Sequence, residues 1–235
     1  MDYAVAFMLI WWLNILLLVA ASYLSIVVVK LLFSKKHSKE IMLVKRVVFV
    51  LLSLAVLVLT LANLVNVAFR FVAVAWWLDN VLFIGSYLCF ATAFGYFWYS
   101  TAKMHQLHIK EPIFMLGVVC GVFIWLYYLF VLSIIPGAEG AGLVSRLFAY
   151  SPPILVSLMF LLTLVVHPRM KAKIIRTPIW YISSGVFLYF IAYMIREYYV
   201  WNTSYSFIPV AYSSLMLLSS FYFALGFFAA KKKFA

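Results

Sequence analysis

Acidic side chains are scarce in this sequence, and charged side chains of either sign are few. Six residues are Asp or Glu against 18 Lys and Arg, and charged residues make up 10% of the 235-residue chain. Soluble domains have about a quarter of their residues charged and about half apolar. Here 68% of the residues are hydrophobic, which is more than one core of this size can bury. The composition therefore excludes an ordinary soluble domain and predicts a chain surrounded by lipid.

Cysteine is also nearly absent, as are the motifs of the common enzyme classes. Cys89 and Cys120 both lie in apolar runs, so we expect no disulfide framework and interpret both as packing residues. The chain has no zinc-protease helix motif, nucleophile elbow, phosphate-binding loop or CxxC pair. The first apolar run is too long for a signal peptide and lacks a basic leading segment. We expect a non-enzymatic protein without a cofactor.

The four histidines do not form a recognisable metal-binding pattern. His105 and His108 are three residues apart, and His37 and His167 lie at other ends of apolar runs. A zinc site needs a third and usually a fourth ligand, and the two cysteines lie too deep in their runs to supply one. A haem held by two histidines would need them to face each other inside the membrane. The sequence predicts neither group.

Seven apolar runs are long enough to cross a bilayer as helices, which takes about 20 residues each. The fifth run contains Ser151-Pro152-Pro153, and a helix that began at Pro152 would be too short. We expect it to begin near Leu143 and to be kinked in its outer half. The predicted fold is a single all-α polytopic membrane domain over residues 1–235. The predicted spans are 4–33, 47–69, 75–100, 113–135, 143–166, 179–201 and 206–229.

The basic residues predict the orientation of these helices. The segments that follow the odd-numbered spans, together with Lys30, hold 15 of the 18 Lys and Arg. Positive loops stay in the cytoplasm, so the N-terminus is expected outside and the C-terminus inside. The net charge of +12 is divided among short juxtamembrane runs, which indicates lipid headgroups and not nucleic acid as the partner.

A weak internal repeat runs through the chain. A shift of 131 residues places the second and third spans on the sixth and seventh, and Phe94-Gly95-Tyr96-Phe97 on Leu225-Gly226-Phe227-Phe228. Two equally oriented halves need a single helix between them, so the shift predicts a parallel three-one-three arrangement. Apolar helices also match by chance, and the sequence leaves both explanations open.

Polar residues within the spans mark a candidate ligand site, because each is costly to leave unpaired in hydrocarbon. They form one stripe on the second span and one on the sixth, both near the predicted outer surface, and the first stripe leads to the start of the third span. A small polar or anionic ligand would suit them. Alternatively, Arg70 pairs with Asp79, and Arg196 with Glu197 or Asp79, while the asparagines bond between helices. The candidate residues are Asn63, Asn66, Arg70, Asp79, Tyr189, Tyr193, Arg196 and Glu197.

Two hairpins share a pattern, from Arg46 to Lys103 and from Arg176 to Lys233. Each has a basic end, a long apolar helix, a polar-aromatic outer turn, and a second helix that closes on Gly, aromatic residues and a basic end. This pattern resembles the hairpins of seven-helix sensor modules in prokaryotic, especially archaeal, membrane signalling proteins. The resemblance covers about half of the chain and implies a sensory protein of a prokaryotic cell membrane. Such modules feed a cytoplasmic output domain, so either a separate protein partner or an output domain beyond this sequence would be needed.

Other seven-helix families fit less well. Retinal proteins need a lysine in the middle of the last helix, and here no lysine precedes Lys231 in that span. Rhodopsin-like receptors carry an acid-Arg-aromatic motif where this chain has Trp98 to Lys103, and small sugar transporters of the SWEET class need prolines that the first two spans lack. We therefore expect a receptor-like module with an outward-facing polar pocket and a basic cytoplasmic docking face. A small-solute transporter or channel, or a structural subunit of a larger membrane complex, are the alternatives.

Overall fold

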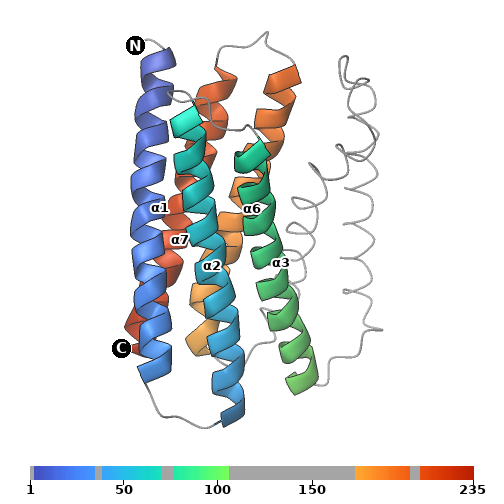
Figure 1. Cartoon of the computed structure of the whole chain (residues 1–235). Coiled ribbons are helices and arrows are strands. Elements are labelled where there is room, and N and C mark those ends of the chain that lie inside the picture. Colours follow the sequence, from blue (N-terminus) through green and yellow to red (C-terminus); the bar gives the residue numbers. More distant parts are fainter. Residues whose placement is uncertain (1–2, 35–38, 70–76, 106–172, 202–206) are drawn as a thin grey trace.

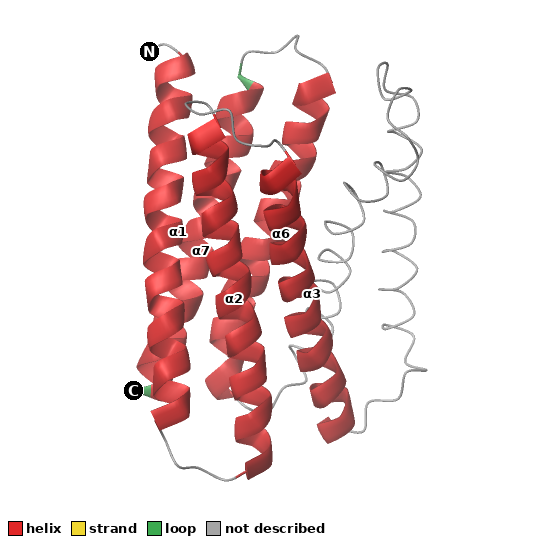
Figure 2. Ribbon diagram, viewed as in Figure 1, coloured by secondary structure: helices red, strands yellow, loops and turns green. Residues whose placement is uncertain are grey.

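The computed structural model describes residues 3–34, 39–69, 77–105, 173–201 and 207–235, and the secondary structure in these segments is helical. Long helices lie side by side along a common direction (Figures 1 and 2). The predicted spans 113–135 and 143–166, with the kink at 151–153, lie outside the described residues. The described helices are α1 (Tyr3–Ser34), α2 (Lys39–Phe69), α3 (Trp77–His105), α6 (Lys173–Trp201) and α7 (Ile208–Phe234).

Three of these helices are long and apolar enough to cross a membrane. They contain the candidate spans Val5–Ser34, Leu43–Val67 and Ile208–Phe234, and α3 contains a shorter apolar stretch, Val81–Phe97. The shortest of the three, with 25 residues, is about 38 Å long at about 1.5 Å per residue, which exceeds the bilayer core of about 30 Å. Apolar side chains also cover the exposed face of α1, as at Leu13 and Leu16. The predicted all-helical membrane protein is confirmed at this level.

Several predicted helix boundaries are wrong, because hydropathy marks only the part of a helix that lies in lipid. α2 begins at Lys39 instead of residue 47, and α7 continues to Phe234 instead of ending at 229. Lysine, glutamate and leucine are good helix formers, so the basic segments extend the helices. α6 begins at Lys173 instead of residue 179, and it encloses Pro178.

The helices pack in the order α6, α7, α1, α2, α3. The two ends of the chain lie at opposite ends of the bundle (Figure 1). α1, α3 and α7 begin at what we term the N-terminal end. The other end, termed the lysine end, carries Lys30, Lys45 and Lys231 to Lys233 on α1, α2 and α7.

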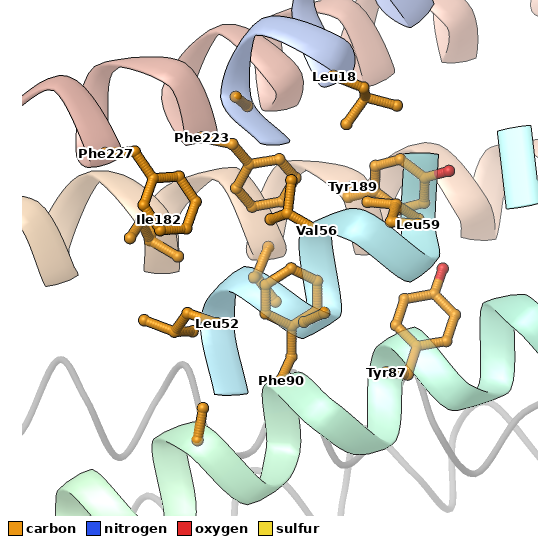
Figure 3. Close-up of a cluster of buried hydrophobic side chains, with 14 of the residues drawn as sticks. Leu18, Leu52, Val56, Leu59, Tyr87, Phe90, Ile182, Tyr189, Phe223 and Phe227 are labelled. Carbon is orange, nitrogen blue, oxygen red and sulfur yellow. The ribbon is translucent and has the colours of Figure 1, made fainter. Parts of the chain in front are cut away.

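Layers of buried side chains fill the interior between α2, α3, α6 and α7 (Figure 3). Tyr87 and Tyr189 form the layer nearest the N-terminal end in this view. Toward the lysine end, to the left in Figure 3, the rings of Phe90 and Phe223 stack with centroids 5.5 Å apart and planes 16° apart. Nearer the lysine end, Phe49 contacts Phe227 and Phe234 edge to face. The interior thus changes from tyrosine at the N-terminal end to phenylalanine at the lysine end.

The buried positions correct the register of the predicted repeat. The gapless shift of 131 places buried Phe97 on exposed Phe228, so that register is wrong. Burial matches instead at an offset of 130 residues between α2 and α6, as in Ser53 and Ser183, and at 133 between α3 and α7, as in Phe90 and Phe223. The buried residues of α2 from Val48 to Asn63 then coincide with those of α6 from Pro178 to Tyr193.

One hydrogen bond recurs under these two offsets. In α2–α3, Ser86 Oγ donates to the backbone oxygen of Ala55 at 2.9 Å. In α6–α7, Ser219 Oγ donates to the backbone oxygen of Gly185 at 2.6 Å. Donor and acceptor are equivalent positions in both hairpins, and helical periodicity alone does not require the same bond at both. Each hairpin is therefore held by the same serine-to-backbone bond near its middle.

Candidate functional site

Asn63, predicted as a site residue, lies fully buried on the α6-facing side of α2. Its Nδ2 donates to the backbone oxygen of Leu59, one turn earlier, at 2.8 Å. The same Nδ2 also donates to the hydroxyl oxygen of Tyr189 on α6 at 3.2 Å. Its Oδ1 is buried and accepts no hydrogen bond in the described structure. A buried amide with one unused acceptor is costly, so this oxygen is available to a donor.

Tyr189, which accepts a hydrogen bond from this amide, belongs to a group of aromatic rings from α3 and α6. Tyr87 meets Tyr189 and Tyr193 edge to face, with ring centroids 6.4 and 6.0 Å apart. Phe83 lies 6.5 Å from Tyr189, between centroids. Figure 3 shows the hydroxyl groups of Tyr87 and Tyr189 at the same end of the view. We term these residues, with Asn63 and Arg196, the tyrosine cluster.

Helical spacing explains why these side chains meet. Phe83 and Tyr87 are four residues apart on α3, and so are Tyr189 and Tyr193 on α6. Residues at this spacing share one face of a helix. Arg196 is a further turn along the same face, and its guanidinium carbon lies 6.0 Å from the centre of the Phe83 ring. A cation over an aromatic face is attracted to the ring, so Arg196 is held beside the cluster at its N-terminal edge.

The structure brings together only part of the predicted site. Asn63, Tyr189, Tyr193 and Arg196 belong to the tyrosine cluster, while Asn66 lies half-buried on α2 one turn nearer its end. Arg70 and the side chains of Asp79 and Glu197 lie outside the described residues, as do the ion pairs predicted for them.

Sequence reasoning missed the two α3 members, Phe83 and Tyr87. They sit at a helical spacing that any lipid-facing or packing stripe also has, so the sequence carried no signal to separate them. It also missed Asn14, for which a signal existed: an isolated amide in the middle of a long apolar run is costly in lipid and needs a partner.

Asn14 is the centre of a second buried polar group, between α1 and α7. Ser220 Oγ donates to Asn14 Oδ1 at 2.6 Å. The Nδ2 of Asn14 and the Nε1 of Trp11, one turn away, donate no hydrogen bond within the described residues. The bond to Ser220 joins the first and last helices, so we assign this group to closure of the bundle.

A third group of hydroxyls joins α1 to α2. Ser22 and Thr60 share a hydrogen bond of 2.9 Å, and Ser25 and Ser53 share one of 2.7 Å. Such bonds between small hydroxylated residues let membrane helices approach closely. With Ser219 and Ser220 of α7, they give the small polar residues a role in packing.

The lysine end is held by contacts of its own. Arg46 Nε donates to the backbone oxygen of Leu32 at 3.0 Å, which satisfies a carbonyl in the last turn of α1. Lys233 Nζ donates to Thr177 Oγ1 at 3.5 Å, and so links α7 to α6. Within the described segments, no three His, Cys, Asp or Glu side chains are grouped as a metal site would need.

Comparisons with protein-family models, with curated proteins and with solved structures give no match to this chain. The function is therefore inferred from the side chains themselves. They form a polar and aromatic cluster at one end of the interior, phenylalanine packing beyond it, and a basic surface at the opposite end.

Proposed function

We propose that this protein is a non-enzymatic sensory module of a prokaryotic cell membrane. A small ligand binds at the tyrosine cluster, and the response is read at the lysine end by a protein or domain that contacts this end. The observation that carries this proposal is the buried Oδ1 of Asn63, which has no donor within the described residues although the same amide is bonded to Tyr189 of the aromatic group. The predicted orientation, with the N-terminus outside, would make this site outward-facing.

The route of the signal follows from the way the hairpins are joined. Within each hairpin, a serine hydroxyl is bonded to the backbone of the neighbouring helix. Between the hairpins, Asn63 to Tyr189 is a side-chain hydrogen bond at one end, whereas the contacts below it are stacked or edge-to-face rings. Ring packing allows small shifts at lower cost than breaking hydrogen bonds. A ligand that donates to Asn63 Oδ1 therefore shifts this amide together with the bonded Tyr189, and so moves one hairpin relative to the other.

We include the three-one-three arrangement of seven spans in this proposal. The matching burial at offsets of 130 and 133 residues and the recurring serine bond support duplication of a hairpin. Phe90 and Phe223 are equivalent under these offsets and also touch each other. A residue that contacts its own equivalent lies near a two-fold axis, so the axis would pass between these two rings.

The proposed transmission of the signal from Asn63 to the lysine end, termed the relay, is tested by measuring a distance across the lysine end. Spin labels are placed at Leu43 of α2 and Trp180 of α6, both exposed, in full-length protein with Cys89 and Cys120 replaced by alanine. We expect Asn63→Leu in lipid nanodiscs to change the label-to-label distance by about 2 Å or more, the size of a typical helix shift. The change follows from loss of the bond to Tyr189.

Ser86→Ala is the matched control, because it removes a buried hydrogen bond within one hairpin and should leave the distance unaltered. Tyr189→Phe keeps the ring and removes the hydroxyl, and it replaces Asn63→Leu if that variant does not fold. A well-folded Asn63→Leu or Tyr189→Phe protein with the wild-type distance would rule out the relay.

A small-solute transporter is the second candidate, and the hairpin equivalence favours it, because many transporters are built from repeats with the substrate at their interface. Val56 is fully buried on α2 between the tyrosine cluster and the lysine end. Its accessibility to reagents from each side distinguishes a transporter from a sensor. A transporter would expose Val56→Cys in turn to a membrane-impermeant thiol reagent from either side of a proteoliposome. For a sensor we expect no modification from the lysine end, whatever the reaction from the other side.

A further inference from the structure

The chemistry of the tyrosine cluster indicates which ligand it takes, on the premise that the cluster is the sensory site proposed above. Both N–H positions of the Asn63 amide are already used, one toward Leu59 and one toward Tyr189. What is left is Oδ1, which is an acceptor only. A ligand group placed here must therefore donate a hydrogen bond. A carboxylate or phosphate oxygen would face another acceptor and would be repelled.

The aromatic group that begins with Tyr189, the partner of Asn63, determines the body of the ligand. Phe83, Tyr87, Tyr189 and Tyr193 meet at 6.0 to 6.5 Å between centroids in tilted and edge-to-face pairs. This is the spacing at which aromatic rings attract each other through their quadrupoles, beyond the effect of area alone. An aromatic ring of the ligand can join such a group in the same way. An aliphatic group would make only the apolar contacts that it also makes with lipid chains, so it would have no preference for this site.

Arg196, the remaining member of the cluster, argues against a positively charged ligand. Arg196 is half-buried with its guanidinium over Phe83, so the cluster already has a cation at its N-terminal edge. Because this guanidinium lies over the Phe83 ring, a cationic ligand could not make the same cation–ring contact there. We infer that the ligand is an uncharged aromatic molecule that carries an O–H or N–H donor, with the chemistry of a phenol or an indole.

Four small probes test this inference by equilibrium dialysis against the full-length protein in nanodiscs, after subtraction of binding to empty nanodiscs. Phenol has the aromatic ring and the donor, anisole lacks the donor, cyclohexanol has a saturated ring in place of the aromatic one, and benzylammonium adds a positive charge. We expect saturable phenol binding about fivefold tighter than anisole binding, which corresponds to one ordinary hydrogen bond. Cyclohexanol and benzylammonium should bind more weakly than phenol.

Asn63→Leu should abolish the difference between phenol and anisole, whereas Asn14→Leu, which removes an equally buried amide between α1 and α7, should preserve it. Equal binding of phenol and anisole to the wild-type protein would overturn the inference and would indicate that water satisfies Asn63. Tighter binding of benzylammonium or cyclohexanol than of phenol would overturn it too. The wild-type comparison does not depend on any variant folding.

The two proposals fail separately. If phenol binds as expected but the distance between the labels at Leu43 and Trp180 stays the same with and without it, the ligand class stands and the sensory function does not. If Asn63→Leu changes that distance but phenol and anisole bind alike, the relay stands and the ligand class is wrong.

Discussion

Replacing Gly226 or Gly185 by alanine is expected to destabilise the protein by about 1–3 kcal/mol, because α6 and α7 leave no room for the added methyl group. A Cβ at Gly226 would lie 2.5 Å from Ile182 Cγ1 and 3.1 Å from the backbone oxygen of Pro178. A Cβ at Gly185 would lie 2.9 Å from the Phe223 ring and 3.0 Å from the backbone oxygen of Ser219. Backbone atoms cannot move aside without separating the helices. Unfolding in mixed detergent micelles with increasing SDS measures the loss.

Gly85 on α3 is the matched control. A Cβ there would meet Val58 Cγ1 at 3.7 Å, an ordinary contact. Alanine in place of a helical glycine generally stabilises by about 0.5–1 kcal/mol, so Gly85→Ala should be neutral or slightly stabilising. If Gly226→Ala and Gly185→Ala unfolded at the same detergent fraction as Gly85→Ala, the close approach of α6 and α7 would be incorrect.

Truncation of the stacked rings at the centre is expected to cost more. Phe223 is fully buried and Phe90 nearly so, and their rings stack across the interface between the two hairpins. Phe→Ala at such a site costs about 3–5 kcal/mol through lost burial and the cavity left behind. The double variant should be less destabilised than the sum of the two by about 0.5–1.5 kcal/mol, the energy of the aromatic pair. The same SDS titration of the four proteins gives this coupling.

A second cycle checks the position of Phe223 independently. Because a Cβ at Gly185 would strike this ring, Phe223→Ala should remove part of the cost of Gly185→Ala. Phe90→Ala, which leaves the Phe223 ring in place, should not. If the stability loss of Phe223→Ala simply added to that of Phe90→Ala and to that of Gly185→Ala, the packing at the centre of the bundle would be contradicted.

The candidate site was predictable only in part. Asn63, Tyr189, Tyr193 and Arg196 stood out because polar groups in an apolar helix need partners, and the spacing of the last three placed them on one face. The contact between Asn63 and Tyr189 joins residues 126 positions apart. No local pattern specifies it, and for the same reason Phe83 and Tyr87 were not recognised as neighbours of that amide.

The sequence by itself determined that the described segments form helices, three of them long and apolar enough to cross a membrane, since the length and hydropathy of each run decide whether a helix can satisfy its own backbone in a bilayer. It also indicated where the lipid-embedded parts of α1, α2 and α7 lie. Tertiary structure alone decided the lateral order of the helices, the offsets of 130 and 133 residues between the hairpins, and the meeting of Asn63 with the tyrosines. Those features depend on how side chains such as Gly185 and Phe223 fit across an interface, and apolar helices of similar periodicity do not encode that fit locally.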